Sequence, residues 1–171
     1  MGLPQYKSKE YTIERVYFAG TDTLRTGQPL CYQESPSTAS VTTGFTYDVE
    51  IPNSTNRGVF AGIVPQNMNG IVGPAYIDII VPQRGDIVQV LVSRAADVAV
   101  GAILRLNNDI GTTTSDLGGF DALAASTVAT SVAGSISVNV FKELPALNIA
   151  LESVASTSTD SARSLVYVRF L

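Results

Sequence analysis

Apolar and polar residues alternate along much of this chain, and this period of two constrains the fold more than any other feature. In "SLVYVRFL", the last eight residues, Val166, Val168 and Phe170 alternate with Tyr167 and Arg169. Alternation of this kind is typical of a β-strand with one buried face. We therefore expect an all-β protein. Further strands are indicated by the segments "TIERVYF", "RGVFAGIV", "YIDIIV", "DIVQVLV", "AILRLN" and "GSISVNVF".

Three of the expected strands follow a glycine at the same distance. The segments "GQPLCY", "GDIVQV" and "GAILRL" begin at Gly27, Gly85 and Gly101, and each has apolar residues at its fourth and sixth positions. A tight glycine turn that feeds a strand with its apolar pair on one face suits a small β-barrel or sandwich. The copies are unequally spaced, so the pattern does not indicate a solenoid.

The chain of 171 residues is long enough for one domain with a hydrophobic core. We expect an extended, polar N-terminal arm at residues 1–10 and a single β-barrel domain at residues 11–171. Within that domain, the Ser-, Thr- and Pro-rich residues 33–56 are expected to form an excursion, and residues 107–119 a long polar loop. Helix signals are weak and amount to a turn or two within residues 120–134. The segment "LPALNIALESVAS" favours a strand.

The tripeptide Arg84-Gly85-Asp86 is the sequence that integrins bind in adhesion ligands. Here it directly precedes the strand segment "IVQVLV". Glycine at a positive φ and an aspartate bonded to its own backbone are ordinary turn chemistry. The turns at Gly27 and Gly101 carry neither the arginine nor the aspartate, so we interpret the tripeptide as a structural turn. We expect Arg84→Lys and Asp86→Glu to be tolerated, and Gly85→Val to impair folding.

The residue types present argue against several kinds of chemistry. Without histidine, the chain cannot form Ser-His-Asp or Cys-His catalytic sets, nor most zinc sites. Its carboxylates are scattered singly, and the one cysteine, Cys31, is expected to be a buried apolar side chain rather than a nucleophile. We therefore predict that the protein is not an enzyme and holds no cofactor and no metal.

Charge and hydropathy bear on the partners. The formal net charge is -4 and there is no basic run, so nucleic-acid binding is not expected. No apolar run approaches the roughly 18 residues of a membrane span, and the N-terminus lacks the apolar stretch of a signal peptide. We therefore expect no membrane insertion and no secretion by the usual route. Charged residues make up only 15% of the chain, which is a first indication of burial by other subunits.

The order of these segments resembles that of a known family. A polar arm leads to the glycine-entered strand of "RTGQPLCY", followed by "RGVFAGIV", "GDIVQVLV" and "VAVGAILRL"; the chain ends in "ALNIALESVAS" and "SLVYVRFL". Over residues 11–171 this arrangement resembles the head decoration (cement) proteins of tailed bacteriophages, in particular the group with a small, tulip-like β-barrel. The insertion at residues 33–56 departs from a compact member of that group.

The resemblance implies a structural protein of the virion: a homotrimer on the outer capsid surface that binds the major capsid protein and stabilises the shell. The capsid-binding residues are then expected in the arm and the first strand. Leu3, Tyr6 and Tyr11 would be apolar anchors, and Lys7 and Lys9 would face acidic groups of the shell.

Two other classes of function compete with this interpretation. One is a phage tail or fibre module, or another surface module, that binds a receptor or a glycan through exposed tyrosines. The other is a small trimeric β enzyme with an active site shared between subunits. The enzyme would need an Asp-containing catalytic stretch, which the sequence does not show.

Overall fold

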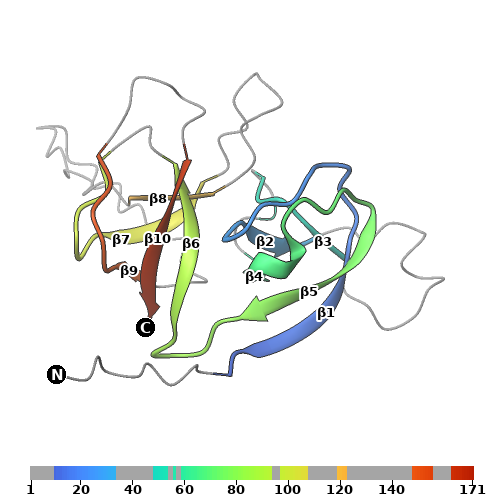
Figure 1. The fold of residues 1–171 in the computed structure, drawn as a ribbon, viewed down its shortest axis with the longest axis horizontal. Coiled ribbons are helices and arrows are strands. Elements are labelled where there is room, and N and C mark those ends of the chain that lie inside the picture. The colour runs from blue at the N-terminus through green and yellow to red at the C-terminus, as the bar shows by residue number, and fades with distance from the viewer. Residues whose placement is uncertain are drawn as a thin grey trace, which may run out of the picture.

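The strands of this protein form two closed five-stranded β-barrels, which we call barrel 1 and barrel 2. They stand out as two separate groups of strands in Figure 1. The structure, a computed structural model, describes residues 10–33, 48–53, 56, 59–93, 97–107, 119–122, 148–155 and 163–171.

Barrel 1 is built by the first half of the chain and barrel 2 by the second half. Barrel 1 contains β1 (Thr12–Phe18), β2 (Pro29–Tyr32), β3 (Asp48–Glu50), β4 (Phe60–Ile63) and β5 (Ala75–Val81), with the 3-10 helix η1 (Gln66–Met68) after β4. Barrel 2 contains β6 (Ile87–Ser93), β7 (Ile103–Asn107), β8 (Gly119–Ala122), β9 (Asn148–Ala150) and β10 (Arg163–Phe170).

The all-β fold class expected from the alternation is confirmed. One local expectation was wrong. Asp48–Glu50, assigned to an excursion, form β3 inside barrel 1, because three residues are too few to show a period of two. Phe120–Ala122, at the start of the segment in which a turn or two of helix is expected, belong to β8, and the rest of that segment lies outside the described residues. The expected strand "GSISVNVF" and most of the two expected loops lie outside the described residues. The assignment of residues 11–171 to one domain stays a prediction.

The three glycine turns are confirmed. Gly27, Gly85 and Gly101 have φ angles of 77°, 87° and 83°, and each stands two residues before the first residue of β2, β6 or β7. A side chain disfavours this backbone region, because its Cβ approaches the neighbouring carbonyl. Most of the apolar residues that follow at the fourth and sixth positions are buried: Leu30, Val88, Val90, Leu104 and Leu106.

The two barrels are topological copies of each other. In barrel 1, β1 pairs in parallel with β3 and antiparallel with β5; β2 pairs antiparallel with β3 and β4, and β4 with β5. Barrel 2 repeats every one of these pairings, with β6 to β10 taking the places of β1 to β5 in order. The sequence analysis did not anticipate this repetition.

Backbone hydrogen bonds fix which residues of the two barrels are equivalent. The amide of Gly27 donates to the carbonyl of Val64, and the amide of Gly101 donates to the carbonyl of Ala150, both at 2.8 Å. In each barrel a return bond of 2.9 Å runs back to the residue after the glycine. Gly27 therefore corresponds to Gly101, and the strand registers extend this correspondence to the remaining strands.

The two interiors exchange a large residue for a small one. Phe18 on β1 pairs with Val49 on β3, and the equivalent pair on β6 and β8 is Val92 with Phe120. All four side chains are fully buried. Each barrel thus keeps one phenyl ring and one valine in this layer, so the filled volume is conserved. The ring comes from β1 in barrel 1 and from β8, the equivalent of β3, in barrel 2.

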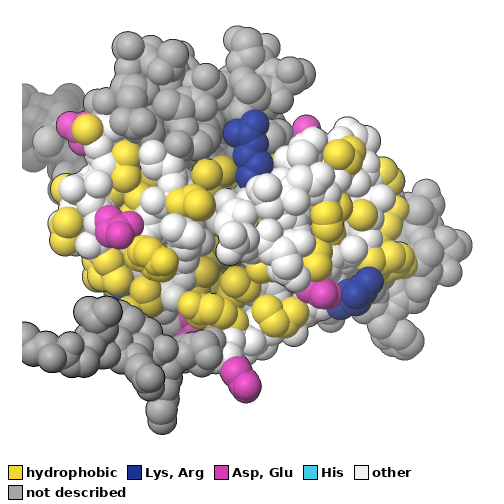
Figure 2. Space-filling view, in the orientation of Figure 1, with side chains coloured by type: hydrophobic (Ala, Val, Ile, Leu, Met, Phe, Trp, Pro, Cys, Tyr) yellow, Lys and Arg dark blue, Asp and Glu magenta, His cyan; other side chains and the backbone are white. Residues whose placement is uncertain are grey.

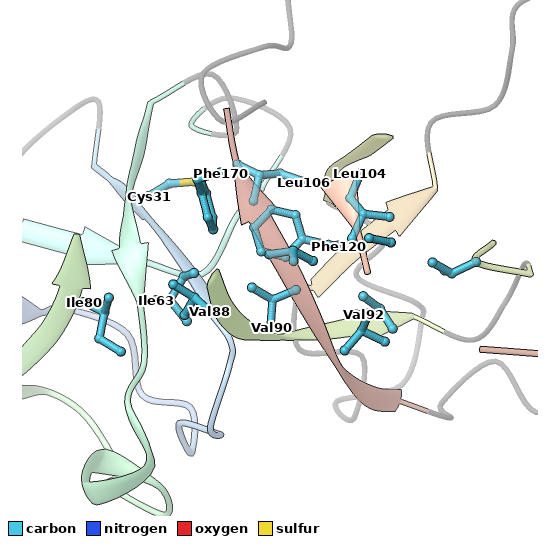
Figure 3. Close-up of a cluster of buried hydrophobic side chains, with 14 residues drawn as sticks. Cys31, Ile63, Ile80, Val88, Val90, Val92, Leu104, Leu106, Phe120 and Phe170 are labelled. Atoms are coloured by element: carbon cyan, nitrogen blue, oxygen red, sulfur yellow. The ribbon is translucent and has the colours of Figure 1, made fainter. Parts of the chain in front are cut away.

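Barrel 1 packs on barrel 2 through outward side chains of β2, β4 and β5. Three of them belong to the buried cluster that fills barrel 2: Cys31, Ile63 and Ile80 (Figure 3). The ring of Phe60 lies 6.3 Å from that of Phe120 and 6.1 Å from that of Phe170, measured between centroids. A second buried cluster lies within barrel 1. Because one cluster draws on both barrels, removing either barrel would expose apolar surface of the other.

Gly27 lies directly against the backbone of barrel 2. The amide of Leu91 donates to the carbonyl of Gly27 at 2.8 Å. A Cβ atom on Gly27 would lie 2.6 Å from Cδ2 of Leu165 and 2.8 Å from the amide nitrogen of Leu91, whereas a Cβ on Gly101 would meet nothing within 4 Å. Glycine at position 27 therefore serves both a turn and the contact between barrels, and Gly101 serves the turn.

Candidate interaction surfaces

Of the five residues expected to bind a capsid, the structure describes Tyr11. Leu3, Tyr6, Lys7 and Lys9 lie outside the described residues. Tyr11 immediately precedes β1 and is 36% exposed. Its hydroxyl donates to the carbonyl of Ile87 in barrel 2 at 2.7 Å, so the ring is held across the junction of the two barrels.

Tyr11 is followed by a second exposed apolar side chain, Ile13, which is 53% exposed on β1. Ile13 pairs with Ile80 on β5, and the side chain of Ile80 is buried in the contact between the barrels. The exposed Ile13 therefore lies next to that contact. Tyr11 and Ile13 together place apolar surface at the point where residues 1–10 enter the fold. Large apolar groups in solvent are typical of surfaces that bind other molecules when they lie together.

Further along β1 and β5, aromatic and charged side chains share the outward face. The rings of Tyr17 and Tyr76 contact each other with centroids 5.1 Å apart. Beside them, Nη1 of Arg15 lies 3.4 Å from Oδ1 of Asp78, an ion pair open to solvent. Tyrosine and arginine are enriched at protein interfaces, and exposed ion pairs add little to stability.

Barrel 2 carries a row of outward residues that runs across four strands. Ile103 pairs with Ile149, Ile149 with Arg169, and Arg169 with Ile87. We call this set the outer row of barrel 2. Ile103 and Ile87 are each 38% exposed, and Arg169 is exposed between them. Figure 2 shows hydrophobic side chains spread over both barrels with single charged side chains among them.

The turn that contains Arg84-Gly85-Asp86 has a structural role, as predicted. Asp86 is only 2% exposed, and its Oδ2 accepts a hydrogen bond from the amide of Gln83 at 2.8 Å. An integrin ligand must present this carboxylate to its receptor, which a buried, bonded Asp86 does not. Arg84 is exposed. The burial of Asp86 also revises one expectation: Asp86→Glu adds a methylene to a closed site and should destabilise the turn.

Cys31 is fully buried in the contact between the barrels, as expected of a structural cysteine. Burial raises the pKa of its thiol from 9.0 to about 12, and the charge of Glu50 adds to the rise. Because the thiolate is the reactive form, Cys31 is not activated as a nucleophile in this site.

Glu50 in turn belongs to a closed polar cluster after β3. Its Oε1 accepts hydrogen bonds from Nδ2 of Asn53 at 2.9 Å and from Nδ2 of Asn56 at 2.8 Å. Asn56 is fully buried, and its backbone amide donates to Oδ1 of Asn53 at 3.0 Å. These bonds satisfy buried polar atoms and hold the segment in place, which is a structural role.

Within the described residues, His, Cys, Asp and Glu side chains do not gather in groups of three or more that would hold a metal ion. No helix among the described residues has the length and apolar character needed to cross a membrane. The prediction that the protein is not an enzyme stays a prediction.

The fold defines the class of this protein as an all-β chain of two equivalent five-stranded barrels. No protein-family model, no curated protein and no solved structure matches the chain. Its surfaces therefore carry the argument about function. Sequence reasoning named Tyr11 as an apolar anchor for capsid binding, which stays a prediction. It did not anticipate the outer row of barrel 2, because its members come from four strands whose pairing no local pattern reveals.

Proposed function

We propose that this chain is a non-enzymatic structural protein of a tailed-phage virion, which binds the outside of the capsid and stabilises it. In this proposal its partners are the major capsid protein and further copies of itself, as a homotrimer. The order of strand segments, which resembles that of phage decoration proteins, supports the proposal.

The observation that carries the attachment site is the exposed apolar pair Tyr11 and Ile13. It lies where residues 1–10 join a barrel, so an arm lying on the shell and the start of β1 form one continuous surface. Tyr11 is fixed by its bond to Ile87, which lowers the entropy lost when the ring is buried by a partner. Each contact can be weak, because a trimer engages several capsid subunits at once.

The proposal is tested by sedimenting the full chain with empty, expanded capsids of the phage that encodes it. We expect saturable binding with hundreds of sites per particle. Deletion of residues 1–10 and the variant Ile13→Ser should each reduce the bound fraction. Val72→Ser is the matched control, because Val72 is 59% exposed on barrel 1 but lies away from the start of β1.

Absence of binding by the unmodified chain would refute the function, and unchanged binding by the two altered chains would refute the attachment site. A handful of copies per particle, together with binding to a glycan array, would instead favour the tail or fibre module that recognises a receptor.

A further inference from the structure

The contact between the two barrels uses different faces on the two barrels. Barrel 1 contributes Gly27 and three members of its own outer row, Pro29, Ile63 and Ile80, which are buried; the row is equivalent to that of barrel 2 and ends in Ile13, which stays 53% exposed. Barrel 2 contributes a different region, around Leu91 and Leu165, which we call its end face. A contact between unlike faces is heterologous.

A heterologous contact leaves one face unused on each barrel. The outer row of barrel 2 is not covered, since Arg169 is exposed where the equivalent Ile80 is 9% exposed. The space beside Gly101 is open, whereas the space beside Gly27 is filled by barrel 2. On barrel 1, the residue equivalent to Leu91, which is 6% exposed, is Tyr17, which is only half-buried.

The free outer row of barrel 2 keeps the apolar character of its buried counterpart. Ile103, Ile149 and Ile87 take the places of Pro29, Ile63 and Ile13. At three of its four positions the free row is therefore as apolar as the row in barrel 1. The charged member of the free row is Arg169, the equivalent of Ile80.

The free end face of barrel 1 carries Glu14 in addition to the ion pair of Arg15 with Asp78. Glu14 is the equivalent of Val88 in barrel 2, because Glu14 follows Ile13 and Val88 follows Ile87, and Ile13 and Ile87 are equivalent positions. Inside the chain, Ile80 and Val88 belong to the same buried cluster (Figure 3). The two equivalent positions hold Arg169, which is exposed, and Glu14, which is half-buried and whose Oε2 accepts a hydrogen bond of 3.5 Å from the hydroxyl of Tyr32.

We propose that copies of this chain join head to tail, with the outer row of barrel 2 of one copy seated on the end face of barrel 1 of the next. The contact repeats the one that joins the barrels within a chain. Arg169 of one copy meets Glu14 of the next, and Gly101 meets Tyr17 and Tyr76, the equivalents of Leu91 and Leu165. The number of copies rests on the proposed function, whereas the pairing of faces rests on the two barrels alone.

Charge reversal with the full chain tests the pairing, with association measured by analytical ultracentrifugation over a range of concentrations. We expect the unmodified chain to associate, and Arg169→Glu and Glu14→Lys each to weaken association at least about tenfold. The double variant should recover most of the loss, because every contact then pairs a lysine with a glutamate. Arg25→Glu is the control, since Arg25 is exposed beside the face that barrel 2 already covers.

A chain that is monomeric at every concentration overturns the inference, and so does a double variant that associates no better than the single ones. Circular dichroism checks that each variant is folded. If a charge variant does not fold, Gly101→Ala provides the test, because its methyl group is free in one chain but would strike the neighbour. Association of Gly101→Ala at the unmodified strength also overturns the inference.

Capsid binding and association fail separately in these experiments. If the chain does not bind capsids but charge reversal still weakens association, the proposed function is refuted and the pairing of faces stands. If capsid binding is intact and charge reversal leaves association unchanged, the proposed function stands and the pairing of faces is refuted.

Discussion

Replacing Gly27 and Gly101 by alanine, one at a time, compares two equivalent turns that differ in their surroundings. Both glycines have a positive φ, so alanine costs about 1–2 kcal/mol of backbone strain at either position. At Gly101 this is the whole expected cost, because the new methyl group meets nothing within 4 Å.

At Gly27 the methyl group meets barrel 2. Cδ2 of Leu165 can move aside, but the amide nitrogen of Leu91 at 2.8 Å and the carbonyl carbon of Val90 at 3.0 Å belong to the backbone of β6. Overpacking of this kind costs about 1–3 kcal/mol. It also strains the hydrogen bond from Leu91 to Gly27, which contributes about 1 kcal/mol. We therefore expect Gly27→Ala to lower the free energy of unfolding by about 3–6 kcal/mol.

The assay is urea unfolding followed by circular dichroism, at a protein concentration low enough that association does not contribute. Since domains of this kind are stable by about 5–15 kcal/mol, the two variants should be separated clearly. Equal losses at the two positions, or a loss at Gly27 no larger than the strain alone, would show that the barrels do not meet through Gly27.

Three further predictions follow from the same structure. Asp86→Ala should lower the free energy of unfolding by about 1–3 kcal/mol, because the amide of Gln83 loses its partner, while Arg84→Lys should change it by less than about 0.5 kcal/mol; thermal unfolding measures both. Cys31 should resist thiol reagents until the chain unfolds. The free energy of unfolding should fall as the pH rises from 9.0 toward about 12, because over that range the thiol ionises in the unfolded chain and not in the folded one. A free energy of unfolding that does not change with pH over this range contradicts the burial. Calorimetry should show one unfolding transition for both barrels, because the cluster with Ile63 spans them, and two separate transitions would contradict the coupling.

Much of the fold was predictable because its signals are local. The runs that became β1, β5, β6 and β10 are seven or eight residues long, enough to show a period of two. The glycine turns were predictable for the same reason, since a positive φ and the apolar pair that follows fall within six residues. Strand β3 was missed because a segment of three residues has no measurable period.

The second barrel was not predictable, because equivalent positions often differ in residue type. Phe18 and Val49 in one barrel become Val92 and Phe120 in the other, so the volume of the layer is conserved while each strand changes its sequence. Only Gly27 and Gly101, with the leucine three residues after each, keep the same residues along β2 and β7. A pattern so sparse indicates a recurring turn, and the pairing of strands is needed to show a repeated barrel.

The differences between the barrels also distinguish the covered faces from the free ones. Ile80 and Val88 lie in a contact that forms once, during folding, and apolar side chains suit it because the surface is not exposed again. Their equivalents, Arg169 and Glu14, lie on faces that a folded chain must carry in water before it finds a partner. The opposite charges of Arg169 and Glu14 limit contact between like faces and favour the unlike pair. In the proposed association, the same barrel geometry serves a permanent contact within the chain and a selective contact between chains.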